Sequence, residues 1–307
     1  MIITCCTDTF FEWGILFLES FKLTNDNDIP IHINGVWLSE NQIETFKSIY
    51  PSVTIDNKTF GEKWIAKKYG VTIEDVRRCR ERISRGFKHK CRFWMDFIVV
   101  DGRISWLLET MEKNKDQPWW LHLDIDMMFR FSIQSLIDDI LKHDVVCRFR
   151  PNQTFTRPNG KQPPDSMKIA GGMLGLRGEN GIRFVKKWTE KIASKTWRDY
   201  AKATGRKDGL MGRGEPWGQT ALYYAYEHYK DEFTWKQIEE WWLMASCNLR
   251  NPIWCGHKKG RVMWRGKKYN IPSREHLRDI LFKELENMEN DGDKKWMNSI
   301  EVLPEKR

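Results

Sequence analysis

The sequence predicts an α/β fold in which one mixed, mostly parallel sheet is flanked by helices within a single large domain. Strand-like and helix-like segments alternate along the chain, and this order favours a sheet that helices cover on both faces. Of the 307 residues, 40% are hydrophobic and 30% are charged, as in a folded globular protein. No stretch approaches the ~20 apolar residues of a membrane span, and we see no secretory signal, so we expect a cytoplasmic protein.

Three strands and two helices are expected in the first sixty residues. Short apolar or alternating runs predict the strands, and apolar residues at helical spacing predict the helices between them. Ser39 stands where it can cap the second helix. The expected order is a strand at 2–6, a helix at 10–23, a strand at 29–37, a helix ending at 49 and a strand at 53–55.

The rest of the chain continues the alternation. Residues 60–114 are expected to be helical, and residues 118–129 form the clearest unit, an apolar strand that ends in two carboxylates. The further expected elements are helices at 132–141, 182–193, 217–229 and 274–288, strands at 144–147 and 169–176, polar or glycine-containing loops at 152–166 and 203–216, and a basic loop at 253–261.

Three D-x-D pairs occur in the sequence, and only Asp124 and Asp126 follow an apolar strand. The other two pairs lie in polar stretches, where Asp serves turns and solvation. Two carboxylates at the end of a buried strand repel each other unless a cation or ligand compensates them. Alternation along the strand would point both to the same side, with His122 one step behind. Because open α/β sheets bind ligands beyond the carboxyl ends of their strands, we expect a divalent cation here, with two solvated acids as the alternative.

Positive charge is concentrated in two segments of the chain. The net charge is +9, yet residues 58–92 alone contain twelve Lys or Arg against four Asp or Glu. Residues 255–274 contain seven Lys or Arg and no acidic residue. This distribution indicates an anionic partner such as a diphosphate or a polyanion, and a solvated basic face is the alternative.

At its motifs the chain resembles the GT-A-fold nucleotide-sugar glycosyltransferases, most closely the retaining family 8 type. The resemblance rests on Leu-His-Leu-Asp-Ile-Asp at 121–126, Gly-Gly-Met-Leu-Gly at 171–175, Trp-Gly-Gln at 217–219 and His-Lys-Lys-Gly at 257–260. It implies a GT-A catalytic domain over residues 1–265, followed by a C-terminal helix and polar tail at 266–307. The chain departs from the family at Met263, Gly218 and Ala170, where Lys, Asp and Asn are usual.

The resemblance also implies a metal site and a donor site. In that family the D-x-D carboxylates and the His of the H-x-x-G motif bind Mn²⁺, and Asp124, Asp126 and His257 match those positions here. Mg²⁺ is the alternative ion, and the metal bridges the diphosphate of a nucleotide sugar, expected to be UDP-linked. The implied donor-binding positions are Thr4, Asp124, Gly171, Gly172, Lys259 and Gly260.

The stereochemistry of transfer depends on which group assists the sugar cation. Glycosyl transfer passes through an oxocarbenium-like transition state. In a retaining enzyme the departing phosphate can receive the acceptor proton, and Gln219 would stabilise the sugar cation through its amide oxygen. An inverting enzyme needs a carboxylate base, for which Asp165 and Glu215 are the candidates. We favour retention.

The surplus of basic charge points to an anionic acceptor. Duplex DNA with hydroxymethylated bases, which some phage glycosyltransferases modify, and a lipid-linked bacterial glycan are the two expected acceptors, with a protein behind them. For a phage protein the location would be the host cytoplasm. Two other function classes stay open: a sugar nucleotidyltransferase, which usually has a glycine-rich loop near the first strand, and a non-enzymatic nucleic-acid-binding protein, which leaves the D-x-D pair unexplained.

Overall fold

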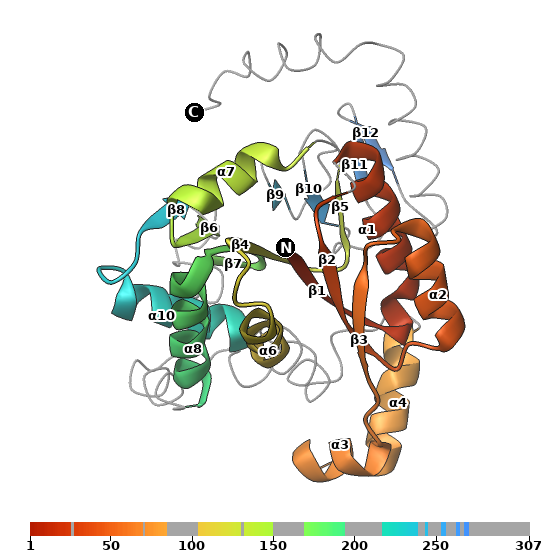
Figure 1. The fold of residues 1–307 in the computed structure, drawn as a ribbon. Helices are drawn as coiled ribbons and strands as arrows, with labels where there is room; N and C mark the ends of the chain where they lie inside the picture. Colours follow the sequence, from red (N-terminus) through yellow and green to blue (C-terminus); the bar gives the residue numbers. More distant parts are fainter. Residues whose placement is uncertain are drawn as a thin grey trace.

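The fold centres on a seven-stranded sheet with the strand order β3-β2-β1-β4-β7-β6-β8 (Figure 1). The structure is a computed structural model, and it describes residues 1–25, 28–69, 71–84, 104–129, 132–149, 169–193, 217–238, 243–244, 253–255, 262–264 and 267–269. The strands of this sheet are β1 (Ile2–Thr7), β2 (Ile31–Val36), β3 (Thr54–Lys58), β4 (Trp119–Leu123), β6 (Val145–Phe149), β7 (Ile169–Arg177) and β8 (Trp235–Gln237).

Most strand pairs in the sheet are parallel. β1 pairs in parallel with β2 and β4, β2 with β3, and β6 with β8. β7 runs antiparallel to both of its neighbours, β4 and β6. The predicted mixed, mostly parallel sheet with flanking helices is therefore confirmed.

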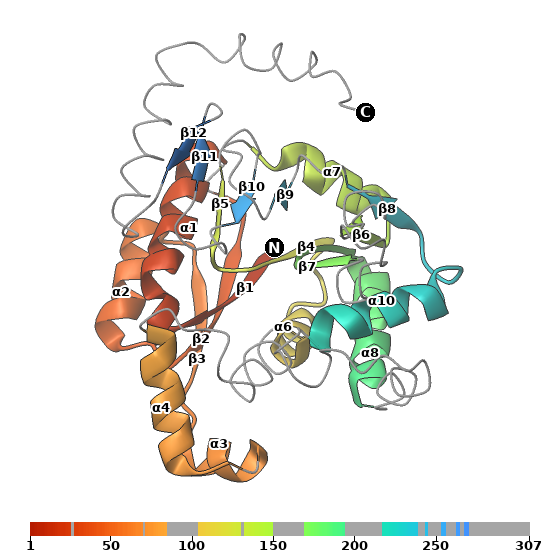
Figure 2. The ribbon, with the colours of Figure 1, turned by 180° about the vertical axis from the view of Figure 1, so that it is seen from behind.

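Helices cover both faces of the sheet (Figures 1 and 2). On one face, α1 (Phe11–Thr24), α2 (Glu40–Ile49) and α7 (Gln134–Lys142) enclose the larger apolar core. On the other face, α6 (Trp106–Lys113), α8 (Gly178–Ala193) and α10 (Trp217–Tyr229) enclose a second core. The central strand β1 is buried on both sides, because Ile2 and Cys6 enter the first core while Ile3 enters the second.

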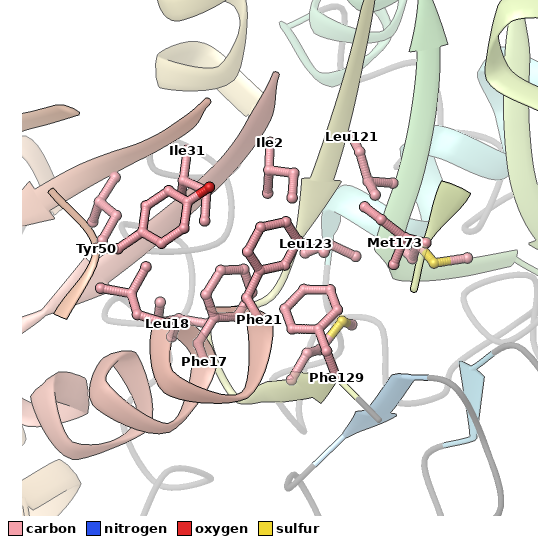
Figure 3. Packing of buried hydrophobic residues seen from close by; sticks show 14 of the residues in the cluster. Ile2, Phe17, Leu18, Phe21, Ile31, Tyr50, Leu121, Leu123, Phe129 and Met173 are labelled. Carbon is pink, nitrogen blue, oxygen red and sulfur yellow. The ribbon is translucent and has the colours of Figure 1, made fainter. Parts of the chain in front are cut away.

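Aromatic rings lock α1 onto the sheet (Figure 3). Phe21 meets Phe129 and Tyr50 edge to face, with ring centroids 4.9 and 5.8 Å apart, and Phe17 meets Phe129 at 5.0 Å. Such edge-to-face pairs add to the stabilisation that burial of the rings already provides. The turn that leads into Phe129 is thereby held in place.

Two smaller sheets bring the C-terminal part of the chain to the central sheet. β5 (Met127–Phe129) pairs antiparallel with β10 (Ile253–Cys255), which pairs in parallel with β9 (Leu243–Met244). The expected loop at 253–261 thus begins with a strand. β11 (Val262–Trp264) and β12 (Lys267–Tyr269) form a hairpin across the expected domain boundary at residue 265, and the division into two domains stays a prediction.

Several expected elements differ in extent or lie outside the described residues. The strand expected at 118–129 is two strands, because β4 ends at Leu123 and β5 begins at Met127. The helical segment expected from residue 60 contains α3 (Glu62–Tyr69) and α4 (Ile73–Ser84), which project from one end of the molecule (Figure 1). The loops at 152–166 and 203–216 and the helix at 274–288 lie outside the described residues. Within the described part, no helix has the length and apolar character needed to span a membrane.

A buried carboxylate joins the start of β6, the end of β7, α8 and the turn before β8. Asp144 accepts hydrogen bonds from the guanidinium of Arg177 at 2.6 Å, the amide of Asn180 at 2.9 Å and both the backbone N–H and hydroxyl of Thr234 at 2.8 Å. Burial alone would raise the pKa of Asp144, but the hydrogen bonds from Thr234, Asn180 and Arg177 outweigh it and lower the pKa to about 2. Asp144 is therefore charged at neutral pH and connects β6 with β7, α8 and the turn before β8.

Candidate functional site

The carboxyl ends of four parallel strands meet at one edge of the sheet. β1, β2, β3 and β4 run in the same direction, so their last residues and the turns that follow them lie along the same edge. Asp8 follows β1, Trp37 follows β2 and Asp124 follows β4. Ligands of open α/β sheets bind beyond this kind of edge.

The D-x-D pair forms a tight turn rather than the end of a strand. The backbone N–H of Met127 donates a hydrogen bond of 3.2 Å to the carbonyl of Asp124, which closes the turn between β4 and β5. The prediction that strand alternation orients both carboxylates is therefore wrong, since the strand ends one residue before the pair. Asp124 is half-buried, and only 5% of Asp126 is exposed.

Gly172 on β7 makes room for the carboxylate of Asp124. The carbonyl of Gly172 accepts a hydrogen bond of 2.9 Å from the backbone N–H of Asp124. A Cβ atom at Gly172 would lie 2.8 Å from Oδ2 of Asp124 and 2.9 Å from Cε of Met127. Both distances are shorter than real Cβ contacts, so a larger residue at this position would require the Asp124 carboxylate and the end of the Met127 side chain to shift. The predicted contact of Gly171 and Gly172 with a sugar stays a prediction.

Gly175, the last glycine of the same motif, has a packing role. A Cβ atom there would lie 2.5 Å from Cγ1 of Ile140 on α7. The motif therefore combines close helix packing at one position with space for a carboxylate at another.

Thr4, a predicted donor-binding residue, and His122, which lies just before the D-x-D pair, are both deeply buried. Thr4 is 1% exposed and lies on the same face of β1 as Ile2 and Cys6, which is the face that α1 covers. His122 is 2% exposed and is level with Ile3 on β1. The role of Thr4 in donor binding stays a prediction, and its burial means that neighbouring side chains would have to move for direct contact.

Most other predicted site residues lie outside the described residues. These are Asp165, Glu215, His257, Lys259 and Gly260. Gln219 belongs to the first turn of α10, but the placement of its side chain is also outside the description. Among the residues that the structure describes, no three His, Cys, Asp or Glu side chains come together as a metal site. A metal held by Asp124 and Asp126 thus needs at least one more ligand from elsewhere.

Sequence reasoning missed the polar turn that follows β1. There the backbone N–H of Thr9 donates a 2.8 Å hydrogen bond to the Asp8 carboxylate, and the hydroxyls of Thr7 and Thr9 are 2.8 Å apart. β1 and β4 are neighbours in the sheet, so this turn and the D-x-D turn share one edge. The rule that singled out Asp124, a carboxylate after an apolar parallel strand, also applies to Asp8.

An aromatic cluster, also missed, flanks the same edge. Trp37, Phe60 and Trp106 pack with Cys5 of β1. Ile3 is level with His122 of β4, and β4 ends one residue later, so Cys5 lies near the edge where the D-x-D turn begins. We call these three rings the aromatic cluster; it lies beside the D-x-D turn, with one strand between them.

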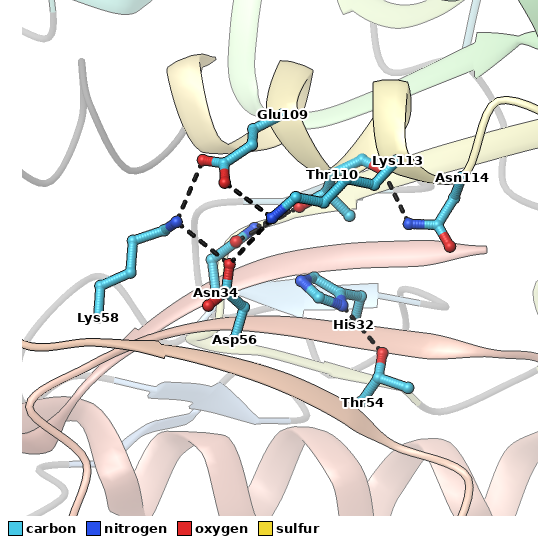
Figure 4. A network of polar contacts seen from close by, with 9 residues as sticks. All are labelled: His32, Asn34, Thr54, Asp56, Lys58, Glu109, Thr110, Lys113 and Asn114. Atoms are coloured by element: carbon cyan, nitrogen blue, oxygen red, sulfur yellow. Dashed lines mark hydrogen bonds and ion pairs between the residues drawn. The ribbon is translucent and has the colours of Figure 1, made fainter.

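The first cation of the basic segment at 58–92 is neutralised within the fold (Figure 4). Lys58 Nζ lies 3.1 Å from both Asp56 and Glu109, and 5.7 Å from the ring centroid of Trp106. Lys113 also pairs with Glu109 at 2.8 Å, and this hydrogen bond is the main reason that the pKa of Glu109 is lowered. Part of the positive charge of this segment is therefore neutralised by acidic residues of the same chain.

Comparisons with known proteins find similar chains among solved structures, all at low identity. No family model matches the chain, and no curated protein is detectably similar to it. Solved structures do match. The mouse xyloside xylosyltransferase 1 apo structure is 12% identical, with 83% of this chain and 96% of that chain covered and a TM-score of 0.44.

Two further transferase structures give similar values of identity and TM-score. LgtC, a galactosyltransferase in complex with donor and acceptor sugar analogues, is 13% identical. The match covers 92% of this chain and 94% of that chain, with a TM-score of 0.46. GlyE of Streptococcus pneumoniae TIGR4 is 10% identical. The match covers 100% of this chain and 65% of that chain, with a TM-score of 0.45. All three are glycosyltransferases.

Proposed function

We propose that the protein is a metal-dependent glycosyltransferase that moves a sugar from a nucleotide-diphosphate sugar, UDP-linked, to a hydroxyl of an anionic acceptor. The observation that carries the proposal is the D-x-D turn at the carboxyl edge of the sheet, with the Asp124 carboxylate set against Gly172. A Cβ atom at Gly172 would meet Oδ2 of Asp124, so the carboxylate lies close against the backbone of β7. Defined carboxylates suit a metal ion better than solvated acids do.

Asp124, Asp126 and His257 would hold the divalent ion. Cys255, two residues before His257, pairs with Met127, the residue that follows Asp126. Two residues of chain reach at most about 7 Å, which is the scale of a metal site with side chains from both segments. The set of two carboxylates and one imidazole suits Mn²⁺ or Mg²⁺, and the ion would supply charge stabilisation for the departing diphosphate.

The chain's own residues would orient the two substrates. The polar turn at Asp8 and Thr9 lies at the same carboxyl edge of the sheet as Asp124 and Asp126. It would present a carboxylate and hydroxyl groups to the donor. We keep retention as the proposed outcome, with Gln219 at the sugar cation. In that case Asp165 and Glu215 have no general-base role.

A mass-spectrometric screen tests the proposal directly. The full-length protein is incubated with a panel of nucleotide sugars and Mn²⁺, with and without glycan or hydroxymethylated DNA acceptors, and nucleotide release and product mass are measured. We expect release from one donor, its loss in chelator, and a product with the anomeric configuration of the donor by NMR. Absence of release from every donor contradicts the proposal. Formation of a nucleotide sugar from a sugar phosphate and a nucleoside triphosphate would indicate a nucleotidyltransferase instead.

A further inference from the structure

The aromatic cluster continues outward to an exposed tryptophan. Trp64 on α3 stacks on Phe60 with ring centroids 4.9 Å apart and planes 27° apart, and Phe60 stacks on Trp106 at 5.7 Å and 10°. Trp106 is buried, whereas 45% of Trp64 is exposed. The three rings therefore form a stack that runs from beside the D-x-D edge to the surface.

The middle ring of this stack, Phe60, is held by Trp37, a residue with a strained backbone. Trp37 has φ of 57°, a left-handed conformation that is unusual for a bulky residue. Its indole N–H donates a 2.8 Å hydrogen bond to the carbonyl of Phe60, and its ring meets Phe60 edge to face. Strained residues persist where the surrounding structure demands them, and they cluster at functional sites. Here the strained residue, Trp37, holds Phe60 in place through its hydrogen bond and its ring contact.

Two unneutralised cations stand beside the exposed ring. Lys63 and Lys67 lie one helical turn apart on α3, are exposed, and carry no ion pair with any residue that the structure describes. Other cations nearby are paired: Lys58 with Asp56 and Glu109, and Arg77 with Glu62 at 2.8 Å. An exposed indole next to two available ammonium groups is a surface that combines apolar stacking with charge recognition.

We propose that Trp64, Lys63 and Lys67 form an acceptor subsite for an anionic saccharide, which we call the α3 platform. The apolar C–H face of a sugar ring would stack on the indole, and a carboxylate or phosphate substituent would pair with the lysines. This deepens the proposed glycosyl transfer and rests on it. Because the reaction centre lies at the other end of the stack, the acceptor is an oligosaccharide that extends beyond the reacting sugar.

The electrostatics of the α3 platform favour a saccharide over duplex DNA. Duplex binders neutralise several phosphates along a continuous basic surface. The described part of this region offers two available lysines, and the acids Glu62, Glu74 and Asp75 are interspersed with its arginines. Two cations match one or two anionic substituents of a glycan.

A binding experiment without donor tests the α3 platform independently of turnover. The full-length protein is applied to an array of uronate-bearing, phosphorylated and neutral oligosaccharides together with single-stranded and duplex DNA. We expect binding to anionic saccharides that weakens with salt. Trp64→Ala should weaken this binding about tenfold, as loss of one aromatic contact implies, while Trp64→Phe should weaken it less. The Lys63→Glu/Lys67→Glu pair should abolish it.

Matched controls separate this proposal from the function on which it rests. The Lys22→Glu/Lys142→Glu variant makes the same change in net charge at exposed lysines on α1 and α7, and it should bind as the wild type does. Donor hydrolysis in the absence of acceptor should be unchanged in all these variants. Unchanged binding in Trp64→Ala, equal loss in the control, a preference for duplex DNA, or no binding to any probe overturns the α3 platform. Absence of donor turnover with intact saccharide binding would contradict the enzyme assignment alone.

Discussion

At the scale of single residues, the proposed chemistry depends on one nearly buried carboxylate. Asp126 is 5% exposed and lies in the turn that also contains Asp124. A divalent ion that binds the folded protein and not the unfolded chain should stabilise the fold as well as support transfer, and Asp126 would be one of its ligands. Two separate measurements can therefore report on the same residue.

Asp126→Asn should remove both effects of the ion. We expect turnover to fall by about 100-fold or more, because the charge stabilisation of the leaving diphosphate is lost. Addition of Mn²⁺ should raise the thermal midpoint of the wild type and leave that of the variant unchanged. Asp116→Asn, at an exposed turn, should behave as the wild type in both assays. Full turnover of Asp126→Asn in chelator would show that the metal site is elsewhere.

Gly172→Ala should disturb Asp124 without removing any polar group. The added methyl group would lie 2.8 Å from Oδ2 of Asp124, so the carboxylate has to move. We expect a loss of turnover of up to about 100-fold from misplacement, and a stability cost of about 1–3 kcal/mol. Gly61→Ala is the matched control, because nothing lies within 4 Å of its added Cβ atom. Wild-type kinetics in a folded Gly172→Ala variant would argue against a defined position for Asp124.

At the scale of elements, local sequence signals predicted what depends on local interactions. Ser39 caps α2 as expected: its hydroxyl accepts from the N–H of Gln42 at 3.3 Å, and the Gln42 side chain accepts from the Ser39 N–H at 2.9 Å. The break between β4 and β5 was not predictable from periodicity, because the run is apolar on both sides of the carboxylates. What ends β4 is the turn at Asp124 and the pairing of β5 with a strand over a hundred residues later.

The Asp144 junction between β6, α8 and β8 should make the protein acid-sensitive. Its folded-state pKa of about 2 lies below the ordinary value of 3.8 for the unfolded chain. The stabilisation is therefore fully present above about pH 4 and is lost as the pH falls towards 2, and it amounts to roughly 2 kcal/mol.

Asp144→Asn should remove this contribution. Urea unfolding should show the variant less stable than the wild type at pH 7, with the difference narrowing as the pH approaches 2. Asp231→Asn, at an exposed position, is the control and should follow the wild type at every pH. An equal pH dependence in Asp144→Asn and wild type would mean that other groups cause the acid sensitivity.

At the scale of the whole molecule, the sequence predicted the sheet class and the place of the D-x-D pair directly after an apolar strand, but not what surrounds that pair. The strand and helix order follows from periodicity, which each segment carries by itself. The aromatic stack from Trp106 to Trp64 joins residues of α6 and α3. Gly172 on β7 meets Asp124 at the end of the neighbouring strand, β4. Neither contact can be predicted from the spacing of residues along the chain. The roles of Gln219 and His257 stay predictions.

Cross-linking can test how the C-terminal segment reaches the edge. Cys255 pairs with Met127 across β10 and β5, and paired residues of antiparallel strands lie within the distance that a disulfide spans. Met127→Cys should therefore form an intramolecular disulfide with Cys255 under mild oxidation, visible by peptide mass mapping. Phe129→Cys faces Ile253 and should not form a bridge there. A reduced Met127→Cys variant after oxidation of the folded protein would contradict the β5–β10 pairing.

The pairing of β5 with β10 also has a consequence for the order of assembly. A nascent chain can complete β1 to β7 with their helices before residue 253 is synthesised, but it cannot yet complete the small sheet next to Asp126. Contacts that join such distant positions require closure of a long loop, so they form late and slowly. We therefore expect catalytic competence to arise only after the central sheet has folded, with a lag between the gain of secondary structure and the gain of metal affinity in refolding experiments.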